Sequence, residues 1–320
     1  MAMSDLMARL GGPGGWLLAD GATGTNLANM GLPAGQPPEL FCEIAPERVL
    51  TLHRQMIAAG AGLVLTNSFG ANARRLQLVG AAARLGAINL AAARLAREAA
   101  AEAQHPVIVA GAIGPTGEIM APLGRLTEAE ATEIFAAQAR ALAEGGVDLL
   151  WFETLSSLDE FRAASRAAEA AGMAWCGTMS FEAGGRSMMG ATPPQLATLI
   201  DRLPFPPLAY GANCGTGPAE LLLAVAGFAA AGCERAQIAK PNAGVPRYLD
   251  GGVIYDATPE AMAEFAVLAR DLGVRIIGGC CGTTPAHLAA MHEALLARPR
   301  GPRPSADAIS ARIGALMPDR

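Results

Sequence analysis

The sequence predicts an α/β protein folded as a (β/α)8 TIM barrel. Short apolar runs ending in Gly, Asn or Thr alternate eight times with longer Ala-, Leu- and Arg-rich segments of helical period. This alternation is expected of βα units that bury a parallel sheet. Small and polar residues also follow nearly every predicted strand. Because a TIM barrel carries its functional residues at the carboxyl ends of its strands, this distribution favours a barrel over an open doubly wound sheet.

The eight predicted strands leave no unpaired strand at either end, which is typical of a closed barrel. They are WLLADG from Trp16, GLVLTNS from Gly62, PVIVAGAIG from Pro106, DLLWFET from Asp148, AWCGTMSF from Ala174, LAYGANCG from Leu208, QIAKPNAG from Gln237 and VRIIGGCCG from Val274.

Helix starts are marked by capping residues. Thr127 and Glu130 have the spacing of a capping box, and Thr258 and Thr284 each precede a proline that suits the first turn of a helix. These signals support the alternation independently of hydrophobicity.

We expect one barrel domain over residues 1–297, followed by a Pro/Arg-rich linker and short tail over residues 298–320. The segment RPRGPRP, residues 298–304, cannot continue a helix because proline lacks an amide donor and has a fixed φ. The tail includes an amphipathic segment, residues 307–316, to which the sequence assigns no role.

Composition excludes several classes of function. The chain has 320 residues, 52% of them hydrophobic, and a net charge of −5 without a basic block. We therefore expect no nucleic-acid partner.

The longest apolar stretch, residues 221–233, is too short to cross a bilayer, and no signal-peptide core is visible, so we expect a cytoplasmic protein without a membrane partner. The oligomeric state stays open, a homo-oligomer included.

Three cysteines form the candidate catalytic centre. Cys214 ends the sixth predicted strand, and Cys280 and Cys281 end the eighth, so a barrel would bring their thiols to one rim. Three thiolates with an open fourth position match a catalytic zinc site. Gly279 and Gly282 flank the pair and supply the backbone freedom that two adjacent ligands need. The cofactor we predict is Zn²⁺.

Structural roles are the alternative for each cysteine. A single cysteine at a strand end is usually a small buried hydrophobic residue, and an adjacent pair can be a vicinal disulfide. We assign such structural roles to Cys42, Cys176 and Cys233, which lack a partner thiol at this rim. No histidine is expected as a ligand.

Several motifs together resemble the homocysteine S-methyltransferase family over about residues 14–296. They are GGCCGTTPAHL at 278–288, GANCG at 211–215, DGATGTNL at 20–27, TNSFGAN at 66–72, GAIGPTGE at 111–118, WFET at 151–154 and KPNAG at 240–244. The resemblance implies a zinc barrel that methylates homocysteine to methionine. The chain is most similar to bacterial betaine-homocysteine methyltransferases, and is also similar to the homocysteine-binding module of cobalamin-dependent methionine synthase. Since no cobalamin or folate module follows, we expect a self-contained enzyme.

The resemblance also implies roles for individual residues. Asp20 and Glu153 would contact the homocysteine amino group, with Thr23 and Asn67 shaping the rim, and Asn242 would ligate zinc when substrate is absent. The structural alternatives are helix capping for the two acids and turn chemistry for Asn242.

Charge logic favours an onium methyl donor, and the resemblance implies glycine betaine as that donor. An anionic thiolate centre attracts a cation, which leaves as a neutral molecule after transfer. The aromatic residues that would hold a trimethylammonium group are sparse, however. The loops after the first two strands offer only Phe41 and Phe69, while Trp151, Phe181, Tyr248 and Tyr255 are the substitutes available elsewhere.

Other functions stay open at this point. The donor could instead be S-methylmethionine or another methyl compound. Lys240 is the only lysine, and a desolvated lysine could form the Schiff base of a lyase. The GAIGPTG loop could bind phosphate, although a lone Gly-rich loop is a weak signal. Finally, the zinc could be purely structural in a scaffold without activity.

Overall fold

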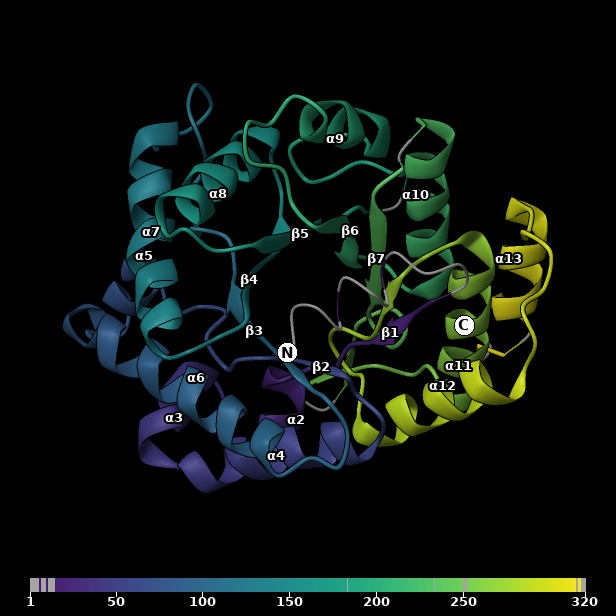
Figure 1. Cartoon of the computed structure of the whole chain (residues 1–320), viewed down its shortest axis with the longest axis horizontal. Helices are drawn as coiled ribbons and strands as arrows, with labels where there is room; N and C mark the ends of the chain where they lie inside the picture. The colour runs from purple at the N-terminus through teal and green to yellow at the C-terminus, as the bar shows by residue number, and fades with distance from the viewer. Residues whose placement is uncertain are drawn as a thin grey trace.

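The computed structural model describes residues 15–182, 184–232, 234–249, 252–314 and 316–317, together with Leu6 and Leu10. Eight parallel strands form one sheet, in the order β1-β10-β7-β6-β5-β4-β3-β2. A parallel bridge between Ala19 and Leu63 joins the two edges and closes the barrel. The predicted barrel is thereby confirmed, and all eight predicted strands lie in it (Figure 1).

The barrel strands are short and buried. They are β1 Leu17–Leu18, β2 Leu63–Leu65, β3 Ile108–Ile113, β4 Leu149–Leu155, β5 Trp175–Met179, β6 Ala209–Cys214, β7 Ala236–Pro241 and β10 Ile276–Ile277.

Helices surround the strands as an outer ring (Figure 1). In chain order they are α2 Gly24–Asn29, η1 Pro38–Leu40, α3 Phe41–Ile44, α4 Pro46–Ala58, α5 Ala73–Gln77, η2 Ala82–Arg84, α6 Leu85–Ala101, α7 Glu128–Glu144, α8 Leu158–Ala170, α9 Pro193–Ile200, α10 Pro218–Ala230, α11 Pro259–Leu272, α12 Pro285–Ala297 and α13 Ala306–Gly314. The predicted caps are confirmed, since Thr127 and Glu130 form a capping box and Thr258 and Thr284 cap α11 and α12. Within the described residues, no helix combines the length and apolar character that a bilayer span requires.

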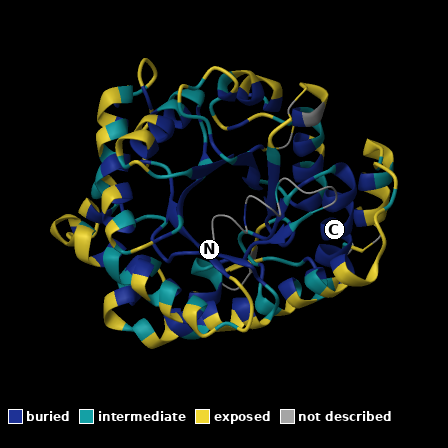
Figure 2. Ribbon diagram, viewed as in Figure 1, coloured by how far each residue is buried: buried dark blue, intermediate teal, exposed yellow. Residues whose placement is uncertain are grey.

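Alternation along each strand divides the core into two layers. Leu63 and Leu65 of β2 point into the barrel and Val64 points outward toward the helices, and the same period of two applies to the neighbouring strands. The inner layer includes Trp151 and is extended by Leu6. Figure 2 shows the buried strands inside a ring of helices whose outer faces are exposed.

A two-stranded antiparallel hairpin lies in the connection between β7 and α11, and the sequence did not predict it. It consists of β8 Arg247–Leu249 and β9 Gly252–Ile254, inserted between β7 and α11. Each strand has only three residues, so neither offers enough alternation to be recognised in the sequence.

The C-terminal tail forms a helix that packs on the barrel. Ile309 and Ile313 of α13 are buried in the outer core layer, against α10 and α11. Glu264 of α11 pairs with both Arg298 and Arg312, at 2.7 and 2.6 Å. The domain boundary at residue 297 stays a prediction, but the amphipathic tail contributes buried apolar surface.

We expect Ile309→Ala to lower the free energy of unfolding by about 2–4 kcal/mol, because the change leaves a cavity under α13. Denaturant unfolding measures the change, with Ser310→Ala on the exposed face of the same helix as the control. Equal stability of the two variants would show that α13 does not stabilise the barrel.

Candidate metal and substrate site

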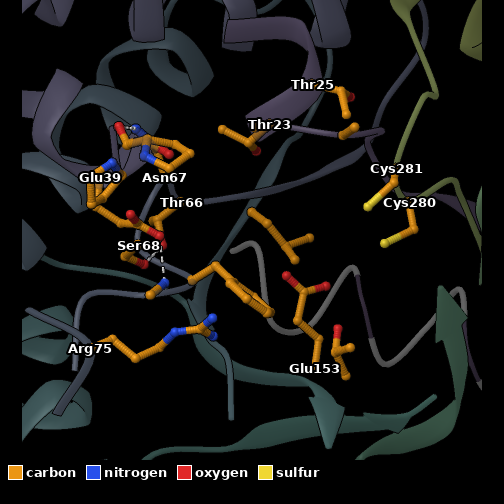
Figure 3. A pocket seen from close by; sticks show the side chains of 18 of the residues that line it. Thr23, Thr25, Glu39, Thr66, Asn67, Ser68, Arg75, Glu153, Cys280 and Cys281 are labelled. Carbon is orange, nitrogen blue, oxygen red and sulfur yellow. Dashed lines mark hydrogen bonds between the residues drawn. The ribbon is translucent and has the colours of Figure 1, made fainter. Parts of the chain in front are cut away.

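The carboxyl ends of the strands open into a cavity of about 680 Å³. Its wall is formed by the loops that follow β1, β2 and β10 and by residues at the carboxyl ends of β4, β6 and β7. Figure 3 shows the residues that matter below, with the cysteine pair on one side and Arg75 on the other. The lining includes Thr23, Glu39, Asn67, Phe69, Arg75, Glu153, Thr154, Cys214, Lys240, Cys280 and Cys281.

Three thiols converge at one side of this cavity. The Sγ atoms of Cys214, Cys280 and Cys281 all lie within 4.8 Å of one another. The strand order explains the convergence, because only β7 separates β6 from β10 in the sheet. Sulfurs at this spacing can share one metal ion, for which Zn–S bonds of about 2.3 Å are typical.

Glycines allow two adjacent cysteines to face the same point. Gly282 has φ +79°, and a Cβ there would lie 2.3 Å from Cβ of Tyr255. A Cβ on Gly279 would lie 2.2 Å from Oγ1 of Thr283. The backbone is also held in place, because Cys280 N–H donates to the Pro241 carbonyl at 2.6 Å. The glycine framing seen in the sequence is therefore a steric requirement.

Cys214 is positioned by an unusual backbone conformation. Its φ is +62°, which costs about 1–3 kcal/mol for a residue with a side chain. Thr154, on the neighbouring wall, also has a positive φ of 63°. Asn213 connects the two segments: its Oδ1 accepts from Thr154 N–H at 2.8 Å, and its Nδ2 donates to Thr154 Oγ1 at 2.7 Å. Asn213 was not among the predicted site residues, although it stands beside Cys214 in the GANCG motif.

The thiols interact strongly with one another. Hydrogen bonds with Cys280 and Cys281 raise the pKa of Cys214, while hydrogen bonds from Cys214 and Cys280 lower the pKa of Cys281 to about 3. The three thiols are therefore close enough for the ionisation of each to depend on the others. Ionising all three at this separation requires a cation between them.

Asn242 lies behind the cysteines and is engaged by the protein. Its Oδ1 accepts from Cys281 N–H at 3.1 Å, and its Nδ2 donates to the Gly215 carbonyl at 2.7 Å. It is buried and does not line the cavity. In this structure Asn242 positions the backbone on both sides of the thiol cluster, and the role of a switchable ligand stays a prediction.

Asp20 and Lys240 form a buried ion pair beneath the cavity. Lys240 Nζ lies 2.8 Å from Asp20 Oδ1, and both side chains are almost fully buried. Asp20 Oδ2 accepts from Leu65 N–H at 2.7 Å. Both carboxylate oxygens therefore have protein donors, and Asp20 does not line the cavity. Lys240 does line it, at the position where the sequence raised the alternative of a Schiff-base lysine.

Glu153, Thr23 and Asn67 all line the cavity, as the family resemblance implies. Desolvation raises the pKa of Glu153 to about 8, although the charge of Lys240 opposes this shift. A cationic group bound beside Glu153 would restore its ionised form. Asn67 is held rigidly, since its Nδ2 donates to the Pro38 carbonyl at 2.7 Å.

Two charged residues on the far side of the cavity, Glu39 and Arg75, were missed. Glu39 lies in η1 and Arg75 in α5, after the first and second barrel strands. The Arg75 guanidinium stacks over the Phe69 ring at 5.4 Å. Glu39 belongs to the GQPPELF stretch, where Phe41 is the residue that suggests donor binding, and Arg75 belongs to no motif. Neither charge carries a local sequence signal of its own.

The aromatic candidates mostly have packing roles. Phe69 is the aromatic residue among the described residues that line the cavity. Phe41, Trp151 and Phe181 are buried in the core. Tyr255 lies within hydrogen-bonding range of the Cys281 sulfur, and the side chain of Tyr248 lies outside the described residues.

The remaining cysteines lie away from the cluster. Cys176 is fully buried inside the barrel, and Cys42 is buried with its sulfur 3.4 Å from the Asn67 carbonyl oxygen. Cys233 lies outside the described residues.

The fold and the site define a (β/α)8 barrel with a cysteine-only candidate metal centre at its catalytic end. The model of the homocysteine S-methyltransferase family matches residues 17–295, and the chain belongs to this family. The family resemblance of the motifs is thereby confirmed.

Relatives and solved structures agree with this placement. The chain is 30% identical over 291 residues to a methionine synthase of Mycobacterium tuberculosis, and 29% identical over 292 residues to that of Mycobacterium leprae. Each match covers 85% of this chain but 24% of the relative, so the chain spans about a quarter of their length. The metallated homocysteine methyltransferase MmuM from Escherichia coli superimposes with a TM-score of 0.71 at 25% identity, covering 87% of this chain and 96% of that one.

We expect Asp20→Leu to destabilise the protein by about 3–5 kcal/mol, because it leaves Lys240 buried without its partner. The double variant Asp20→Leu/Lys240→Met should recover much of this loss, since it removes both charges. Denaturant unfolding of Asp20→Leu, Lys240→Met and the double variant gives the coupling free energy between the two residues. Additive losses in the double variant would show that the two residues act independently.

Proposed function

We propose that the protein catalyses zinc-dependent transfer of a methyl group from a small onium donor to homocysteine, giving methionine. The observation that carries this proposal is the convergence of three thiols at the wall of a cavity large enough for small-molecule substrates. Family membership supplies homocysteine as the acceptor.

The donor set fits zinc. Cys214, Cys280 and Cys281 form the one group of three potential ligands found among the described residues, and soft sulfur ligands suit this metal. A zinc ion there would supply Lewis acidity that lowers the pKa of an incoming thiol and leaves its sulfur nucleophilic. The similar E. coli enzyme MmuM has been crystallised in a metallated form, which supports a metal in this family. A cytoplasmic location, as the sequence predicts, would keep the thiols reduced.

The chain's own residues would bind and orient homocysteine. Glu153 borders the cavity next to the cysteine pair and would accept hydrogen bonds from the substrate amino group (Figure 3). Thr23 and Asn67 would shape the opposite wall. Lys240, held by Asp20, places a positive charge near Cys280 that offsets the negative charge of the thiolates. In this proposal Asp20 does not contact the substrate but holds Lys240 in place beside it.

An onium donor suits the charge of the site. Its positive charge is attracted to the anionic thiolates, and after transfer it leaves as a neutral amine or thioether. Glycine betaine is the donor expected from the sequence, and S-methylmethionine is the alternative. The scarcity of aromatic side chains along the cavity removes part of the argument for a trimethylammonium group.

The rival functions receive less support. Burial alone would lower the pKa of Lys240, but the Asp20 and Glu153 carboxylates outweigh it and raise that pKa, so the amine is protonated and unsuited to forming a Schiff base. Two backbone N–H groups of the GAIGPTG loop already donate hydrogen bonds within the protein and are not free to bind phosphate. Gly114 N–H donates to the Phe69 carbonyl, and Thr116 N–H donates to Glu160 Oε1. A purely structural zinc would not need the adjoining cavity.

We expect about one zinc per chain, and loss of both the zinc and methionine formation in Cys281→Ala. The control is Cys176→Ala, which removes a buried thiol distant from the cavity and should retain zinc. Elemental analysis measures the metal. A metal-free Cys281→Ala protein with full activity would contradict the proposed mechanism.

The zinc-loaded protein should form methionine from homocysteine with at least one donor of a panel. The panel comprises glycine betaine, S-methylmethionine, dimethylsulfoniopropionate and methyl-tetrahydrofolate, and chromatography detects the product. Activity with methyl-tetrahydrofolate alone would overturn the onium proposal.

A further inference from the structure

Tyr255 directly follows the β8–β9 hairpin and lies against the backbone of the thiol cluster. Its side chain is partly buried, packs on the outer core layer and does not line the cavity. A Cβ added to Gly282 would lie 2.3 Å from Cβ of Tyr255. Because Gly282 comes directly after Cys281, the tyrosine is packed against the segment that carries this candidate ligand.

The backbone beyond Tyr255 is attached to two neighbouring elements. Ala257 N–H donates to the Ala243 carbonyl, in the segment after β7, at 2.9 Å. The Ala257 carbonyl oxygen lies 2.9 Å from Nε2 of His287 in α12. These contacts hold Tyr255 in place, so its position beside Cys281 is a fixed feature of the fold.

Tyr255 and Asn213 supply hydrogen bonds to two of the candidate ligands from outside the cavity. The Tyr255 hydroxyl is hydrogen-bonded to the Cys281 sulfur, and Asn213 Nδ2 lies 3.7 Å from the Cys280 sulfur. A phenol stays protonated at neutral pH, and a metal-bound thiolate has no proton to give, so the hydroxyl is the donor. Neither Tyr255 nor Asn213 lines the cavity.

Several sulfurs compete for the methyl group in the proposed reaction. Cys214, Cys280 and Cys281 line the cavity with their sulfurs within 4.8 Å of one another, and the homocysteine sulfur would lie beside them. Attack by a cysteine would form a bond between its sulfur and the methyl carbon, while the bond from that carbon to the donor breaks and its electron pair stays on the donor. A neutral thioether would then replace a charged ligand. The ligand cysteines must therefore be poorer nucleophiles than the substrate.

We propose that Tyr255 directs the methyl group to homocysteine by making Cys281 a poorer nucleophile. A hydrogen bond to a thiolate lowers its basicity, and a less basic thiolate attacks carbon more slowly. The homocysteine sulfur would lie in the cavity, which Tyr255 does not reach, and so would not receive this hydrogen bond. Tyr255 is thus a positioning residue that acts through Cys281. This inference rests on the proposed function and specifies how the site discriminates among its sulfurs.

The test treats the zinc-loaded full chain with methyl iodide in the absence of homocysteine. A sulfur attacks the methyl carbon, iodide leaves with the electron pair, and peptide fragmentation in the mass spectrometer gives the initial rate at each cysteine. For Tyr255→Phe, we expect the rate at Cys281 relative to that at Cys214 to rise roughly 3–10-fold. A charge-assisted hydrogen bond lowers thiolate basicity about 10- to 100-fold, and nucleophilicity follows roughly the 0.4–0.5 power of basicity.

Cys280 provides an internal control within the same variant. Its Asn213 donor is untouched in Tyr255→Phe, so the rate at Cys280 relative to that at Cys214 should stay unchanged. A change in the general accessibility of the cluster would instead affect all three cysteines together.

Tyr210→Phe is the matched control variant. It also removes one phenol hydroxyl, from a β6 side chain that packs against Phe228 in the outer core layer, away from the cavity. The rate at Cys281 relative to that at Cys214 should equal the wild-type ratio. Elemental analysis establishes that each variant holds zinc, and melting temperatures establish that it is folded.

The outcomes separate this inference from the proposed function. An unchanged rate at Cys281 in Tyr255→Phe, an equal rise at all three cysteines, or loss of zinc from this variant would each overturn the inference and leave methyl transfer standing. A wild-type chain that binds no zinc would instead overturn the proposed function, and the inference with it.

Discussion

The buried ion pair between Lys240 and Asp20 is the interaction on which the arrangement of the site depends. It joins β7 to the end of β1, while β10, which leads to Cys280 and Cys281, lies between those strands in the sheet. A buried charge without its partner is strongly destabilising, so the pair defines how these three strands meet. The same lysine charge reaches Cys280, which links the packing of the barrel to the electrostatics of the thiol cluster.

The cysteine cluster depends on local backbone conformations that a typical barrel strand would not adopt. Cys214 and Thr154 have positive φ values, and Asn213 holds them together by hydrogen bonds from both ends of its amide. Asn242 performs the same task between the segments of Cys281 and Gly215. Strain of this kind is maintained only where surrounding contacts over-determine it, and it commonly occurs at functional sites.

The cavity has a division of charge that matches the proposed chemistry. The three cysteines lie on one side with Glu153 and Lys240 near them, whereas Glu39 and Arg75 line the far side. Two apolar core layers lie beneath these residues, so both groups stand on a buried support.

The barrel, its eight strands and the identity of the thiol cluster could all be predicted from the sequence, because strand periodicity, helix caps and the glycines around Cys280 and Cys281 are local signals. The folded structure was needed to show that Asp20 lies beneath Lys240 and not at the cavity wall, that Asn242 supports backbone, and that Glu39 and Arg75 face one cavity. The small β8–β9 hairpin was likewise beyond sequence reasoning. Such relations depend on long-range side-chain packing and burial, which leave no periodic or spacing pattern along the chain.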